Sequence, residues 1–199
     1  MMRRLVQLML GLWLYGATMA MLVRSGLGLD PWDVFHEGLT HHVPLTFGQV
    51  VILVGALVLL LWIPLRQRPG IGTVLNVIVI GLAADATLAV LPDAEHPAVA
   101  VLLLAGGVVG NGLAGAMYVG AGLGPGPRDG LWTGIVARTD LSVRAVRTAL
   151  EVTVVVAGFA LGGTIGVGTV VYALAIGPIV QFFLPWFEMR PRVTAPAAA

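Results

Sequence analysis

One motif of glycines, a proline and an aspartate occurs twice in this chain and holds the residues best suited to ligand chemistry. Its members are Gly26, Gly28, Pro31 and Asp33, and then Gly122, Gly124, Pro127 and Asp129. Glycine breaks a helix and proline fits the first helical turn, so each copy predicts a short helix, over residues 31–40 in the first copy. The positive end of such a helix stabilises a carboxylate or attracts an anion.

The aspartates of the motif have two interpretations. Each carboxylate could simply cap its own helix. Alternatively, Asp33 and Asp129 each form half of a gate, or a site for a cation or a proton, because an ionisable group at membrane depth is costly to bury. Arg128 belongs to one copy only, since Trp32 occupies the equivalent position in the other. This arginine could hold an anionic or polar group, or pair with Asp129 or with a lipid phosphate.

Further polar residues lie inside long apolar stretches, where they should face the interior of a helix bundle and not lipid. With Asp33, Arg128 and Asp129, the candidate lining of a solute or ion pathway comprises Asn76, Asp85, Asn111, Glu151 and Gln181. Arg147 lies four residues before Glu151, a spacing that suits an ion pair on one helix face and favours a structural role for that pair.

The residue types give little support to an enzyme or a metal site. The chain has no cysteine, and its apolar stretches contain no Ser/His pair, zinc-protease signature or carboxylate pair. His36, His41 and His42 do not follow the spacing of a known metal site, and we expect them in a solvated outer loop. We therefore predict no enzymatic activity, no metal and no cofactor.

Membrane-spanning helices are the elements expected to position these residues. Hydrophobic residues make up 58% of the 199 residues and charged residues 11%, a composition that the surface of a soluble domain does not tolerate. Six stretches can cross a hydrocarbon core of about 30 Å as helices, namely residues 5–23, 46–65, 71–91, 99–119, 146–161 and 167–186. The first also has features of a signal peptide, but its glycines align with those of the fourth, which favours its retention.

The arginines predict the topology. All 11 basic residues other than histidine are arginine. With six spans and a cytoplasmic N-terminus, ten of them lie on the cytoplasmic side and Arg24 alone lies outside, which agrees with the positive-inside rule. Both termini are then cytoplasmic, and the outer side collects Asp93, Glu95 and the histidines.

The motif is part of a longer repeat with a constant offset of 96 residues, the separation of Gly26 from Gly122 and of Gly70 from Gly166. Each copy contains three apolar stretches, and this odd number places the second copy upside down in the bilayer. The predicted fold is an all-α membrane domain of six transmembrane helices in two inverted three-helix repeats, residues 1–93 and 94–199. Each repeat carries its short motif helix after its first span, and a cytoplasmic tail starts at about residue 189.

Four segments resemble one known family. The sequences GLGLDPWD (26–33) and GLGPGPRDGL (122–131), with the Gly-x-Gly-Thr-Val openings at 70–74 and 166–170, are similar to the YczE/YyaS/YitT group of bacterial integral membrane proteins, particularly its YczE-like branch. The resemblance extends over nearly the whole chain. It implies a small multi-pass protein of the bacterial plasma membrane, but it implies no substrate and transfers no catalytic residue.

Two classes of function follow from these observations. Inverted repeats and buried polar residues favour a secondary transporter or exporter of a small solute. The alternative is a non-transporting membrane scaffold, or a substrate-capture subunit of a larger complex, in which the duplication merely built a stable bundle. The expected partners are the lipid bilayer and a small solute, with no nucleic acid because the net charge is +1, and homo-oligomerisation is left open. A central cavity lined by both motif copies would favour transport.

Overall fold

Residues 1–189, the part of the chain that the computed structural model describes, contain eight α-helices. They are α1 (Met2–Ser25), α2 (Pro31–Thr40), α3 (Phe47–Leu61), α4 (Ile71–Leu88), α5 (Pro97–Gly120), α6 (Pro127–Val136), α7 (Val143–Ala160) and α8 (Val167–Phe187). Six of these helices coincide with the predicted apolar stretches, and α2 and α6 are the two motif helices. The all-α prediction is confirmed for the described residues, and α2 has the predicted bounds.

Four helices, α1, α4, α5 and α8, are long and apolar enough to cross a membrane. The prediction of six full-length spans is therefore met by four. α3 has 15 residues, which rise only about 22 Å. α7 has 18 residues, but Arg144, Arg147 and Glu151 make its first half too polar. These four helices make the chain a multi-pass membrane protein.

The motif produces the same local backbone in both copies. Gly26 ends α1 in the left-handed region at φ 63°, and Gly122 follows α5 with the same φ. Pro31 and Pro127 then open α2 and α6. Only the first copy has a side-chain cap, because Asp30 accepts hydrogen bonds from the backbone N–H groups of Trp32 and Asp33 whereas Gly126 stands at the start of α6.

Each motif packs against the start of a long helix in the other half of the chain. The Gly72 N–H at the start of α4 donates to the Leu123 carbonyl over 2.9 Å, and the Gly168 N–H at the start of α8 donates to the Leu27 carbonyl over 2.7 Å. The second bond repeats the first at the 96-residue offset, with the halves exchanged. A Cβ at Gly28 would lie 2.6 Å from the Gly166 nitrogen, so this approach requires glycine.

Small residues bring α1, α4, α5 and α8 together. A Cβ at Gly110 of α5 would lie 2.6 Å from the Thr18 side chain of α1, and one at Gly112 would overlap Ile179 of α8. On α1, a Cβ at Gly16 would overlap the Ile80 carbonyl of α4. These small residues therefore let the four helices approach one another closely.

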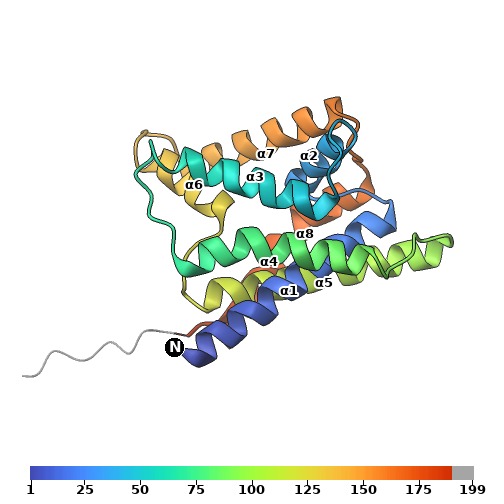
Figure 1. Cartoon of the computed structure of the whole chain (residues 1–199), viewed down its shortest axis with the longest axis horizontal. Coiled ribbons are helices and arrows are strands. Elements are labelled where there is room, and N and C mark those ends of the chain that lie inside the picture. Colours follow the sequence, from blue (N-terminus) through green and yellow to red (C-terminus); the bar gives the residue numbers. More distant parts are fainter. Residues whose placement is uncertain (190–199) are drawn as a thin grey trace, which may run out of the picture.

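The helices form two groups (Figure 1). α3, α6 and α7 lie at the top of the view and α1, α4 and α5 at the bottom. The N-terminus and the connections α3–α4 and α6–α7 lie at the left-hand end, whereas the connection α4–α5 lies at the right-hand end. The Gln7 side chain donates to the Phe187 carbonyl over 2.8 Å, so α8 ends beside the start of α1. Arg190 and Arg192, both predicted to be cytoplasmic, lie outside the described residues.

Candidate functional site

A cavity of about 330 Å³ lies between the helices, and both copies of the motif contribute to its wall. The first copy contributes Asp30, Pro31 and Trp32, and the second copy contributes the segment 126–129. The remaining wall comes from α1, α4, α5, α7 and α8. The two short helices begin inside the protein, because Asp30 before α2 and Pro127 at the start of α6 are both buried.

Most of the predicted pathway residues meet at this cavity. Its lining includes Asn76, Asn111, Arg128, Asp129, Glu151 and Gln181. Asp33 does not line the cavity and is fully buried. Asp85 of α4 does not line the cavity. Its side chain contacts the start of α3, where it accepts hydrogen bonds from the Gly48 N–H over 2.7 Å and from the Thr46 hydroxyl.

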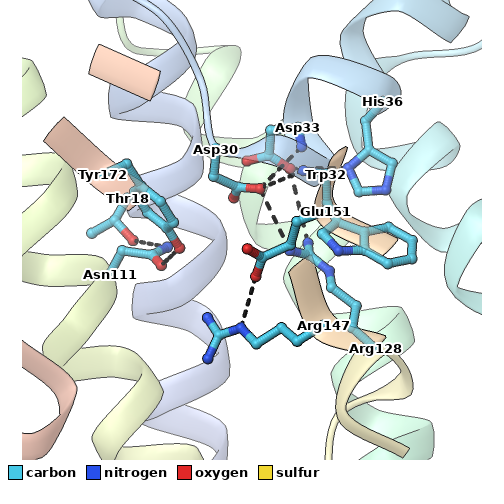
Figure 2. A network of polar contacts seen from close by, with 10 residues as sticks. All are labelled: Thr18, Asp30, Trp32, Asp33, His36, Asn111, Arg128, Arg147, Glu151 and Tyr172. Carbon is cyan, nitrogen blue, oxygen red and sulfur yellow. Dashed lines mark hydrogen bonds and ion pairs between the residues drawn. The ribbon is translucent and has the colours of Figure 1, made fainter. Parts of the chain in front are cut away.

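Arg128 connects the two motif copies. Its guanidinium lies 3.6 Å from Asp30 Oδ1 and 4.0 Å from Asp33 Oδ1, and its Cζ is 5.2 Å from the centroid of the Trp32 ring. Figure 2 shows this side chain beneath the start of α2. The sequence also allowed an ion pair between Arg128 and Asp129. That pair is not observed, and Asp129 accepts a hydrogen bond from the Tyr118 hydroxyl over 2.8 Å instead.

The interpretation of Asp33 as a helix cap is wrong. The backbone donors at the start of α2 bind Asp30 at 2.8 and 3.1 Å, whereas Asp33 Oδ1 lies 2.9 Å from Nδ1 of His36. His36 is only 2% exposed, so its expected place in a solvated loop is also wrong. Both errors have one cause, since α2 starts inside the protein and turns residues three apart toward the same buried surface.

A second polar network joins three spanning helices beside the cavity (Figure 2). The Tyr172 hydroxyl of α8 donates to the Asn111 side chain of α5 over 2.7 Å. The Asn111 amide donates in turn to the Thr18 hydroxyl of α1 over 3.1 Å. The buried polar atoms of Asn111 are thereby satisfied, and the chain of bonds fixes the register of the three helices.

The lining carries more acidic than basic groups. Asp30, Asp129 and Glu151 face Arg128 and Arg147. The predicted ion pair is confirmed, because Arg147 Nε lies 2.8 Å from Glu151 Oε1. Both arginines thus already have acidic partners. Polar and charged groups in a cavity of this size suit a small polar solute.

Several lining residues were not among the sequence candidates. Tyr15, Tyr118 and Trp132 give the cavity an aromatic wall, but aromatic residues carry no sequence signal that separates a cavity from a core. Asp30 did carry a signal, because it directly precedes the motif proline. Among residues 1–189, no three histidine or acidic side chains are grouped so that they could hold a metal ion.

The contact between α3 and α4 is closed, and its counterpart between α7 and α8 is not. A Cβ at Gly81 of α4 would overlap the Gly48 carbonyl of α3, whereas no described atom lies within 4 Å of a Cβ at Gly177, its counterpart on α8. Asp85 holds the start of α3, but its counterpart Gln181 faces the cavity. α7 packs instead on α2 and α6. The cavity therefore lies where the second half of the chain leaves its contact open.

Three comparisons place the chain among known sequences. The model of the "Family of unknown function (DUF6198)" matches residues 2–185. An uncharacterized protein of Haemophilus influenzae is 39% identical over 94% of this chain and 85% of its own length. In Bacillus subtilis, the uncharacterized membrane protein YczE is 39% identical over 81% of this chain and 75% of its own. The uncharacterized protein YyaS of that species is 26% identical over 90% and 91%. No solved structure matches significantly.

Proposed function

This chain belongs to the family of unknown function DUF6198, and we propose that it is a secondary transporter or exporter of a small polar solute in the bacterial plasma membrane. The homology to YczE and YyaS confirms the resemblance found in the sequence. The observation that carries the proposal is the cavity walled by both copies of the motif. A scaffold has no need for such a cavity, and buried polar lining without a ligand is costly.

The proposal includes six spans in two inverted repeats, with both termini cytoplasmic and with α3 and α7 as the short second and fifth spans. The exchanged hydrogen bonds of Gly72 and Gly168 support it, because a two-fold axis in the membrane plane would relate them. A second exchanged pair is the contact of Gly130 with Trp62 and of Val34 with Gly158. Both pairs keep the 96-residue offset.

The unequal contacts of α3 and α7 support alternating access. In this proposal, the protein is open between α7 and α8 at the end that holds the N-terminus, and closed between α3 and α4 at the other end. Asp85 is the latch of the closed gate. In the opposite state α7 closes on α8, Gln181 approaches Ser142, and Asp85 releases α3. Ser142 caps α7 as Thr46 caps α3, so the two latches are chemically similar.

Cysteine cross-linking tests this proposal without knowledge of the solute, because the chain has no cysteine of its own. One variant carries Thr46→Cys and Asp85→Cys, another carries Ser142→Cys and Gln181→Cys, and a third carries all four. The four single-cysteine variants control for loss of the native side chains. We expect both pairs to cross-link in membranes, and each molecule of the third variant to form one cross-link or the other. Cross-linking at 46–85 alone would contradict alternating access and favour the scaffold or substrate-capture function.

A further inference from the structure

Two buried carboxylates share one arginine at the edge of the cavity. Asp30 is 1% exposed and Asp33 is fully buried. Each uses its Oδ1 atom for the contacts described above, with backbone donors, His36 and Arg128. Neither Oδ2 atom has a hydrogen-bond partner among the described residues, although both are buried. A buried carboxylate oxygen without a hydrogen-bond donor is costly as long as the group stays charged.

Titratable groups from six helices surround the Asp30–Asp33 pair. The charged and titratable groups near it are Tyr15 of α1, His36 and Glu37 of α2, Tyr118 of α5, Arg128 and Asp129 of α6, Arg147 and Glu151 of α7, and Tyr172 of α8. α3, which packs on α2, contributes no titratable side chain.

Most of these groups already have other partners. Arg147 binds Glu151, Asp129 binds Tyr118, and Glu37 accepts from the Thr164 N–H over 2.6 Å. A neutral His36 satisfies its Nδ1 by donating to Asp33, and a charged imidazole would be costly at this depth. Arg128 therefore remains as one positive charge opposite two carboxylates.

We propose that the Asp30–Asp33 pair binds one exchangeable proton, and that this proton is the coupling ion of the transporter. The proton neutralises one of the two carboxylates, and Arg128 balances the other. Without the proton, two carboxylates and a single guanidinium would leave a net negative charge buried. It belongs to the pair and not to one residue, since the two acids interact closely. The binding of the proton does not depend on the proposed function, whereas the role of the proton as a coupling ion rests on that function.

The position of Arg128 explains how proton binding connects to the conformation. Arg128 comes from α6 of the second half and the carboxylates belong to the first half, so the ion pair bridges the two repeats. The arginine side chain is 28% exposed and faces the cavity. If α6 moves relative to α2 during alternation, the guanidinium leaves the carboxylates and their proton affinity rises. A cationic solute would compete with the proton for the same oxygens.

Infrared spectroscopy of the full chain in lipid nanodiscs tests proton binding directly. A protonated carboxyl group has a carbonyl stretching band that a carboxylate lacks. We expect wild-type protein to show this band at neutral pH, and the band to shift when aspartate, but not glutamate, is labelled with ¹³C. This labelling uses unmodified protein, so it does not depend on the folding of a variant. Absence of an aspartate band at neutral pH overturns the proposal.

Variants assign the band to the pair. Asp30→Asn with Asp33→Asn should abolish it, whereas Asp93→Asn, which changes an exposed carboxylate paired with Arg24, should leave it intact. Arg128→Gln should raise the midpoint pH of its titration by about 1 to 3 pH units, because a nearby cation lowers proton affinity by that amount. Arg128→Lys keeps a positive charge, so it should raise this midpoint pH by less than Arg128→Gln does. A band that survives the double substitution, or that falls when Na⁺ replaces choline at constant pH, contradicts the proton as ligand.

The outcomes of the two experiments can be told apart. An aspartate band without alternating cross-links would establish the proton site and reject transport. Alternating cross-links without the band would support transport and reject the proton as its coupling ion.

Discussion

Replacing Gly16 by alanine should destabilise the protein, because the added Cβ has no room between α1 and α4. It would overlap the Ile80 carbonyl and lie 2.8 Å from the Ala83 Cβ and 2.9 Å from the Ala84 nitrogen. These are backbone or backbone-attached atoms, so the two helices must separate. At Gly115 of α5, by contrast, a Cβ would meet only the Val180 side chain at 3.4 Å. Gly115→Ala is therefore a matched control on a second buried helix.

The expected magnitudes follow from two opposing effects. Alanine is favoured over glycine inside a helix by about 1 kcal/mol, while overpacking against atoms that cannot move costs about 1–3 kcal/mol. Gly16→Ala should lose up to about 2 kcal/mol of unfolding free energy and Gly115→Ala should gain up to about 1 kcal/mol. Reversible unfolding in mixed micelles, followed by circular dichroism, measures both. Equal stability of the two variants would refute the close α1–α4 packing on which the cavity geometry depends.

Three further predictions concern the polar networks and the topology. Asn111→Leu should cost about 1–3 kcal/mol, measured by the same unfolding assay, because it leaves the buried Tyr172 hydroxyl without its acceptor. Asp33→Asn and Asp129→Asn should insert and fold normally yet fail to complement a deletion strain, and full complementation by the double variant would remove these carboxylates from the mechanism. Reporter fusions after positions 42 and 93 should report the outer side and fusions after 68 and 138 the cytoplasm; the same side for 42 and 138 would exclude inverted repeats.

The motif helices were predictable because their signals are local. A proline that follows an aspartate sets the start of α2, and the glycine pairs set the breaks before α2 and α6, so backbone preference alone determines the element. The six apolar stretches were predictable for a similar reason. The short length of α3 was not, because Trp62 and Ile63 continue the apolar run after the helix has ended.

The contacts between the halves were not predictable from one sequence. The sequence marks Arg128 as different from Trp32, but nothing local reveals that the arginine reaches Asp30 and Asp33 on another helix. The burial of His36 depends in the same way on where α2 starts. Asp85 satisfies the rule that a polar residue in an apolar helix faces the protein, yet that rule does not distinguish a latch between helices from a cavity wall. Tertiary packing alone decides these positions.

An untargeted comparison of metabolites inside and outside cells tests whether this protein transports a solute. Cells that express the wild-type chain would be compared with cells that carry the empty vector and with cells that express Asp33→Asn with Asp129→Asn at the same level. We expect a small polar solute to be redistributed between cell and medium by the wild type alone, and purified protein to move this solute across proteoliposome membranes. Identical distributions in all three strains would contradict transport.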